Sequence, residues 1–77
     1  MLDLEQKNLE QYFQEYGVTD PDLKIKILPE ITDIIYDRNM HAVHYEEITD
    51  EYKKKQILDG IKELDDKIER VFKKYLK

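Results

Sequence analysis

The sequence predicts an all-α fold, a small three-helix bundle that ends in a long amphipathic helix. Apolar residues recur three or four positions apart along most of the chain, which places them on one face of a helix. Only two glycines and two prolines interrupt the 77 residues, so the chain has few turns. The one stretch with strand-like alternation, "LKIKIL" at 23–28, has no second strand to pair with. We therefore expect one helical domain over residues 1–77, with helices at about 2–16, 21–38 and 49–76.

The first predicted helix, 2–16, carries an apolar face whose members repeat at steps of three, four and seven: Leu2, Leu9, Tyr12, Phe13 and Tyr16. Gly17 follows this face directly. Glycine has no Cβ to clash in the left-handed conformation, so it often lies just after the end of a helix. We therefore expect the first helix to end at about Tyr16.

The second predicted helix, 21–38, begins with Asp20 as its N-cap and Pro21 at its first position, where a missing N–H group costs nothing. Its apolar residues share one helical face on both sides of a proline: Leu23, Ile27, Ile31, Ile34 and Ile35. We therefore favour a helix over a strand, kinked or split at Pro29. Asn39 tolerates the left-handed conformation, and later apolar residues leave the face. This predicts an end near 37–39.

The third predicted helix, 49–76, has the clearest pattern. Thr49 is a candidate N-cap, and two acidic residues then follow at the positive end of the helix dipole. The apolar stripe recurs in steps of four and three: Ile57, Ile61, Leu64, Ile68, Val71 and Tyr75. Three further residues widen it: Leu58, Phe72 and Leu76.

The length of this third helix predicts a homodimer. A helix over 49–76 is roughly 40 Å long at about 1.5 Å per residue. A compact chain of this size is only about 30 Å across. The helix would then extend beyond its own globule with part of its stripe uncovered. A second copy of the chain is the simplest cover for that stripe.

Tyr45, Ile48 and Tyr52 form a second apolar group, at positions i, i+3 and i+7. Tyrosine is enriched at interfaces because it buries a large area and keeps a polar tip. Alternatively, this group packs on the first helix beside Tyr12 and Tyr16. The predicted interaction surface combines the group with the stripe of the third helix: Tyr45, Ile48, Tyr52, Ile57, Ile61, Leu64, Ile68, Val71 and Tyr75.

"RNMHAVHYEE" at 38–47 contains both histidines. If the second helix continued through it, Asp37, His41 and His44 would share a face and could bind zinc, nickel or iron(II). The predicted helix end near Asn39 argues against this arrangement. A calcium loop starting at Asp37 would lack the glycine at its sixth position and the glutamate at its twelfth. We therefore interpret the stretch as the connector to the third helix and expect no bound metal.

The residue types that usually carry catalysis are scarce. The chain has no serine and no cysteine, and its three threonines are better explained by caps and helix faces. Glycine-rich phosphate loops need glycines that the chain lacks. We therefore expect neither an enzyme nor a bound cofactor.

Charge divides the chain into two parts. Residues 1–52 hold thirteen acidic and four basic residues, net −9, whereas residues 53–77 hold five acidic and nine basic residues, net +4. Bases and acids interleave on the last helix, so we expect no direct binding of nucleic acid. No apolar run approaches the roughly 18–20 residues of a membrane span, and the first residues do not resemble a signal peptide. We expect a cytoplasmic protein.

These observations favour a small non-enzymatic protein-interaction module, a homodimeric cytosolic regulator, adaptor or inhibitor with a protein partner that the sequence does not identify. The first alternative is a metal-binding or metal-sensing helical protein that uses Asp37, His41 and His44. The second alternative is an acidic inhibitor that mimics nucleic acid, in which residues 1–52 face a basic protein.

Overall fold

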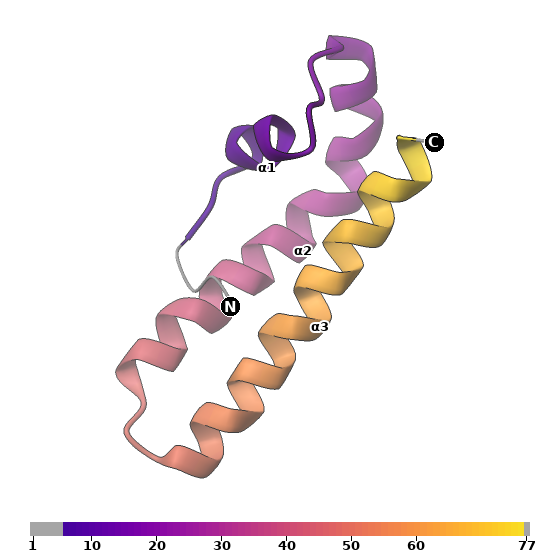
Figure 1. The fold of residues 1–77 in the computed structure, drawn as a ribbon. Coiled ribbons are helices and arrows are strands. Elements are labelled where there is room, and N and C mark those ends of the chain that lie inside the picture. Colours follow the sequence, from indigo (N-terminus) through magenta and orange to yellow (C-terminus); the bar gives the residue numbers. More distant parts are fainter. Residues whose placement is uncertain (1–5, 77) are drawn as a thin grey trace.

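Helices α2 and α3 form an antiparallel hairpin, and the short helix α1 lies against one end of it (Figure 1). The structure is a computed structural model and describes residues 6–76. Helix α1 spans Leu9–Glu15, α2 spans Pro21–Glu47 and α3 spans Glu51–Tyr75. The described residues contain no strand, so the predicted all-α fold of three helices is confirmed.

The main core lies at the end of the hairpin where α1 packs. Its buried side chains come from all three helices and from the link between α1 and α2: Tyr12, Phe13, Val18, Ile27, Ile31, Ile35, Ile68 and Phe72. The ring of Phe72 stacks on Tyr16 with centroids 4.1 Å apart and meets Phe13 edge-on at 6.0 Å. Such pairs contribute roughly 0.5–1.5 kcal/mol beyond the area they bury. The ring contacts join α1 and its C-cap to α3, and the shared core joins them to α2.

Helix α1 begins at a capping box. The Asn8 side chain accepts a hydrogen bond from the Gln11 backbone N–H at 2.9 Å, and the Gln11 side chain accepts one from the Asn8 N–H at 2.8 Å. The predicted start at about residue 2 is wrong where it can be compared, because residues 6–8 are not helical. Leu2 lies outside the described residues. Gly17 adopts the left-handed conformation, with φ 70°, as predicted.

Helix α2 begins as predicted. The Asp20 side chain caps it by accepting a hydrogen bond from the Asp22 N–H at 3.0 Å, and Pro21 is its first residue. The stretch 23–28 is helical, and the helix continues through Pro29 without a break. Figure 1 shows that the helix axis changes direction in this N-terminal part. A bend is expected there, since proline removes a backbone hydrogen bond and crowds the preceding turn.

The predicted end of the second helix near 37–39 is wrong, because α2 runs through both histidines to Glu47. Arg38 and Ala42 extend its buried face at the three- and four-residue steps of a helix. Neither side chain marks a core position by its chemistry, since one is charged and the other is small. The connector is the short stretch 48–50, so "RNMHAVHYEE" belongs to the helix and its interpretation as a connector is wrong.

Helix α3 begins two residues later than predicted. Its N-cap is Asp50 rather than Thr49. The Asp50 carboxylate accepts hydrogen bonds from the backbone N–H groups of Tyr52 at 2.9 Å and Lys53 at 3.4 Å. A carboxylate suits this place because it satisfies unpaired N–H groups and carries the charge that the helix dipole favours.

Helix α2 covers the apolar stripe of α3. The two helices are nearly equal in length, with 27 and 25 residues. Ile61, Ile68 and Phe72 have no exposed area and pack inside the hairpin. The uncovered overhang from which we expected a homodimer is therefore not found in the described residues, because α2 is longer than predicted. Whether two copies of the chain associate stays a prediction. No described helix combines the length and hydrophobicity needed to cross a bilayer.

Arg38 is the only buried charged residue in the part of the chain that the structure describes, and it links three segments. Its Nε donates to the Asp65 carboxylate on α3 at 3.1 Å, and its Nη1 donates to the Asn39 side-chain oxygen at 3.3 Å. The Asn39 amide holds the backbone of Lys7, accepting from its N–H at 3.1 Å and donating to its carbonyl at 2.7 Å. The network joins α2, α3 and the segment before α1.

A second network joins α2 and α3 at the end where α1 packs. The Glu30 carboxylate accepts hydrogen bonds from the Tyr75 hydroxyl and from the Lys74 ammonium, the latter at 3.0 Å. These two hydrogen bonds lower the pKa of Glu30, that of Tyr75 being the larger cause. The same carboxylate raises the pKa of Tyr75 and of Lys74.

We expect Asp65→Ala to lower the free energy of unfolding by about 2–3 kcal/mol, because it removes a partner of a buried guanidinium. The loss is smaller than for a fully buried pair, since the Asp65 side chain is 33% exposed. Arg38→Met removes the charge together with its desolvation cost, so it lowers the stability less. Urea denaturation followed by circular dichroism compares the two variants. A greater loss in Arg38→Met than in Asp65→Ala would contradict this account.

We expect the Glu30 network to stabilise the fold at neutral pH and to lose its effect in acid. A carboxyl group whose pKa is lowered by folding contributes stability above its ordinary pKa, here 4.5, and loses it as the pH falls through the folded-state value. Thermal unfolding of wild type and Glu30→Gln between pH 7 and pH 3 measures this. The wild type should melt higher at pH 7, and the two curves should converge in acid. A constant difference across the range would rule the linkage out.

Candidate functional site

The outer face of α2 carries an exposed apolar stripe. Its members are spaced at helical steps of four, three, four and four: Ile25, Pro29, Thr32, Tyr36 and Met40. At about 100° per residue they fall within an arc of roughly 80°, and they extend over about 22 Å of helix. The three large apolar side chains are 66% (Ile25), 64% (Tyr36) and 50% (Met40) exposed. We call these five residues the outer stripe.

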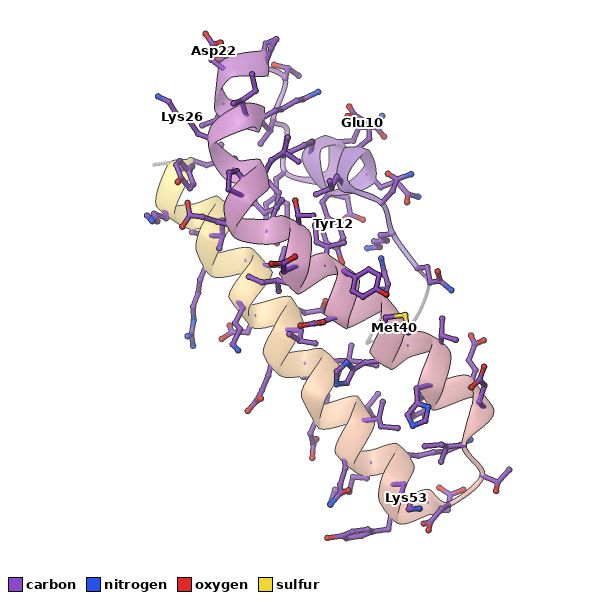
Figure 2. The ribbon with its side chains drawn as sticks, turned by 180° about the vertical axis from the view of Figure 1, so that it is seen from behind. Glu10, Tyr12, Asp22, Lys26, Met40 and Lys53 are labelled. Carbon is purple, nitrogen blue, oxygen red and sulfur yellow. The ribbon has the colours of Figure 1, made fainter. Side chains whose placement is uncertain are left out.

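The outer stripe lies between α1 on one side and a row of charged residues on the other. Figure 2 shows Asp22, Lys26 and Met40 along α2, with Glu10 and Tyr12 of α1 beside it. The Thr32 hydroxyl donates to the Leu28 carbonyl at 2.6 Å, so the polar group of this residue is satisfied within the helix. The stripe therefore presents mainly apolar surface to the solvent.

Asp33 and Asp37 form an acidic flank along the stripe. Both side chains are exposed, and neither makes an ion pair within residues 6–76. They lie one helical turn apart, so their carboxylates repel each other modestly. On the side of α1 the charges are already paired: Lys24 with Glu10 at 3.1 Å, and Lys7 with Glu15 at 2.7 Å. The charge left unpaired beside Tyr36 and Met40 is therefore negative, whereas the exposed Lys26 lies on the same side nearer the start of the stripe.

A shallow hollow adjoins the stripe at the seam between α2 and α3. It has a volume of about 300 Å³ and is lined by Met40, His41, His44 and Ile57. The His41 Nδ1 lies 2.7 Å from the Asp37 backbone carbonyl. Since a carbonyl oxygen only accepts hydrogen bonds, the His41 Nδ1–H group is the donor in this contact. The mixed lining of one methionine, one isoleucine and two imidazoles suits an apolar side chain with a polar neighbour.

Gly60 allows the His41 ring to lie close to α3. A Cβ atom at position 60 would be 3.2 Å from His41 Cδ2 and 3.4 Å from Nε2, which is tighter than ordinary carbon contacts. Glycine within a helix costs about 1 kcal/mol relative to alanine. A side chain at position 60 would therefore require the imidazole to shift by a few tenths of an ångström.

The histidines do not form a recognisable metal site. The unbroken helix places Asp37, His41 and His44 on one side of α2, as the metal hypothesis requires. However, the described residues hold no group of three or more His, Asp or Glu side chains arranged to bind an ion. The twelve residues of the tested calcium loop, 37–48, are helical up to Glu47, which is not the shape of a calcium loop. Metal binding by these three residues stays a hypothesis with no support from their arrangement.

The structure divides the predicted interaction surface among different environments. Ile61 and Ile68 are buried inside the hairpin, and four others are half-buried along the seam with α2: Ile57, Leu64, Val71 and Tyr75. Tyr52 is 71% exposed at the start of α3. Tyr45 and Ile48 are half-buried, and the Lys54 ammonium lies 5.3 Å from the centre of the Tyr45 ring. The predicted surface is therefore partly buried and partly exposed, and its role in an interaction stays a prediction.

Tyr45, Ile48 and Tyr52 lie around the connector, at the far end of the hairpin from α1 (Figure 1). The alternative that they pack beside Tyr12 and Tyr16 is therefore wrong. The outer stripe, by contrast, was missed in the sequence. In the sequence, the stripe corresponds to a second set of residues at helical spacing within 21–47, on a different face from the buried residues. The predicted end of the helix was too early, so this second set was not recognised.

We expect Gly60→Ala to test the contact between His41 and α3. In the wild-type background, Gly60→Ala should change the free energy of unfolding little, because the tight contact with the imidazole offsets the gain in helix propensity. In a His41→Ala background the obstruction is gone, so the same substitution should raise the free energy of unfolding by about 1 kcal/mol. Urea denaturation of the four proteins completes the double-mutant cycle. An equal effect of Gly60→Ala in both backgrounds would disprove the contact.

No protein family, curated protein or solved structure matches this chain. Its function is therefore inferred from its own side chains. The three features that best support a binding surface are the outer stripe, the acidic flank and the hollow. They adjoin one another on α2.

Proposed function

We propose that this protein is a non-enzymatic protein-interaction module whose binding surface is the outer stripe of α2. The observation that carries the proposal is the alignment of Ile25, Tyr36 and Met40, three of the most exposed large apolar side chains, on one face of one helix. Isolated apolar side chains on a surface are ordinary, but three that align on one helix face, with Pro29 and Thr32 between them, indicate a contact site.

The size of the stripe favours a reversible complex. Burying each large apolar side chain contributes on the order of 1.5–3 kcal/mol. Association first has to offset the lost freedom of motion of two molecules, estimated at about 4–15 kcal/mol. Three such side chains with a few charged contacts therefore support modest affinity, which suits a regulator or adaptor that binds and releases its partner.

Two other hypotheses differ from this proposal in the identity of the partner. A homodimer would place a second copy of the chain on the exposed surface. An acidic mimic of nucleic acid would bind a basic protein mainly through the charge of residues 1–52, net −9, with no need for apolar contact. The proposal predicts that the apolar stripe itself forms the contact.

We expect a photo-crosslinking residue at position 36 to capture a partner in cells that naturally make this protein. The residue, p-benzoylphenylalanine, replaces Tyr36 in one variant and Tyr52 in the matched control. Both tyrosines are highly exposed, but only Tyr36 belongs to the outer stripe. Position 36 should give a discrete adduct on a denaturing gel, and position 52 should not.

The mass of the adduct separates the hypotheses. An adduct of twice the chain mass identifies a second copy, and an adduct of another mass identifies a different protein. Adduct formation that disappears with Ile25→Ser or Met40→Ser supports the stripe as the contact. No adduct at position 36, or the same adducts at both positions, would refute the proposed surface.

A further inference from the structure

We infer that the partner presents a basic amphipathic helix, which lies along the outer stripe with its Lys or Arg side chains against Asp33 and Asp37. This inference rests on the proposed function and adds the chemistry of the partner. It follows from three features of the described residues: the sign of the unpaired charge, the helical geometry of the stripe and the hollow at one end of it.

The two carboxylates of the acidic flank attract cationic side chains. Asp33 and Asp37 are exposed, lack an ion-pair partner within the described residues and stand one turn apart on α2. Two cationic side chains spaced by one helical turn on a partner would meet them in register, and would relieve the repulsion between them. The opposite side of the stripe offers no comparable attraction for a charged partner, because its ion pairs are already formed.

The geometry argues for a helix as the bound element. The stripe is an array of side chains at steps of three and four on one continuous helix, and a partner helix of about 15–18 residues matches its length of about 22 Å measured along α2. An amphipathic helix lays one apolar residue per turn on such a face. Helix α1, whose Glu10 pairs with Lys24 of α2, borders the stripe on one side. A bound partner helix would therefore lie between α1 and the carboxylates of the acidic flank.

The hollow provides a place for one anchoring side chain. Its volume of about 300 Å³ is at the lower limit for small-molecule sites, so it suits a leucine or phenylalanine side chain better than a cofactor. Met40 belongs to both the stripe and the hollow. A partner residue that fills the hollow therefore continues the row of apolar contacts onto Ile57 of α3.

A second copy of this chain does not supply such a helix. A two-fold symmetric pair that joins stripe to stripe in antiparallel fashion brings the acidic flank of one copy against the acidic flank of the other. The basic helix of the chain, α3, has its apolar face buried against α2 at Ile61, Ile68 and Phe72. Charge repulsion in this antiparallel pair and the buried apolar face of α3 therefore both favour a different protein as the partner.

The experiment uses two synthetic 18-residue peptides as probes. One has leucines at amphipathic helical spacing with lysine at the remaining positions, and the other has glutamate in place of lysine. Fluorescence anisotropy of the labelled peptides measures binding to the full chain. We expect binding of the lysine peptide that weakens with added salt, and no binding of the glutamate peptide.

Matched variants separate the inferred site from general attraction to an acidic protein. Asp33→Asn with Asp37→Asn should weaken binding about fivefold. Asp59→Asn with Glu63→Gln removes the same charge from the exposed side of α3 and should leave the affinity unchanged. Tyr36→Ser should weaken binding about tenfold, and the control Tyr52→Ser should not. Circular dichroism verifies that each variant keeps its helix content.

Each outcome decides the inference. Equal losses from the two charge-neutralised pairs, or tighter binding of the glutamate peptide, would overturn it. Failure of the lysine peptide to bind, together with a crosslink at position 36, would overturn the basic helix while leaving the proposed function intact. Failure of both experiments would overturn the inference and the proposed function together.

Discussion

Arg38 is the side chain on which the arrangement of the molecule depends. It is 1% exposed, yet it carries a permanent charge, so it can occupy the core only if its N–H groups are matched by acceptors. Asp65 supplies one from α3 and Asn39 supplies another from the same helix. No buried side-chain nitrogen or oxygen in the described residues lacks a partner. A shift of α3 along α2 would separate Arg38 from Asp65, so the charge selects one register where apolar contacts alone would allow several.

Arg38 also explains which parts of the fold could be predicted from the sequence and which could not. The helix class, the cap at Asp20 and the left-handed Gly17 follow from local rules, and the structure agrees with each. At Pro29 a kink or a split was predicted, and the helix bends without a break. The end of α2 depended on Arg38 and Ala42, whose burial is decided by residues far away in the sequence. A charged residue looks like solvent-facing surface until its partner, 27 positions later, is known. The predicted helix end was too early because the periodic pattern was traced through apolar residues only.

The candidate site could be predicted only in part for the same reason. The predicted surface followed the strongest apolar pattern, the stripe of α3, because strong amphipathicity indicates a face that requires cover. That face is covered within the chain once α2 reaches its full length. The outer stripe is weaker in sequence, because Pro29 and Thr32 interrupt its large apolar residues. Its exposure becomes visible only when the buried face of α2 has been assigned to α3.

The hairpin is packed unevenly along its length. Aromatic rings from α1 and α3 fill the core at one end, whereas no residue from 43 to 60 is buried. Local opening costs least where few side chains are buried, so we expect the tip around the connector to open more readily than the aromatic end. The hollow beside Met40 borders that tip. A ligand seated there would couple its own binding to the closing of the tip, so that affinity and local order would rise together.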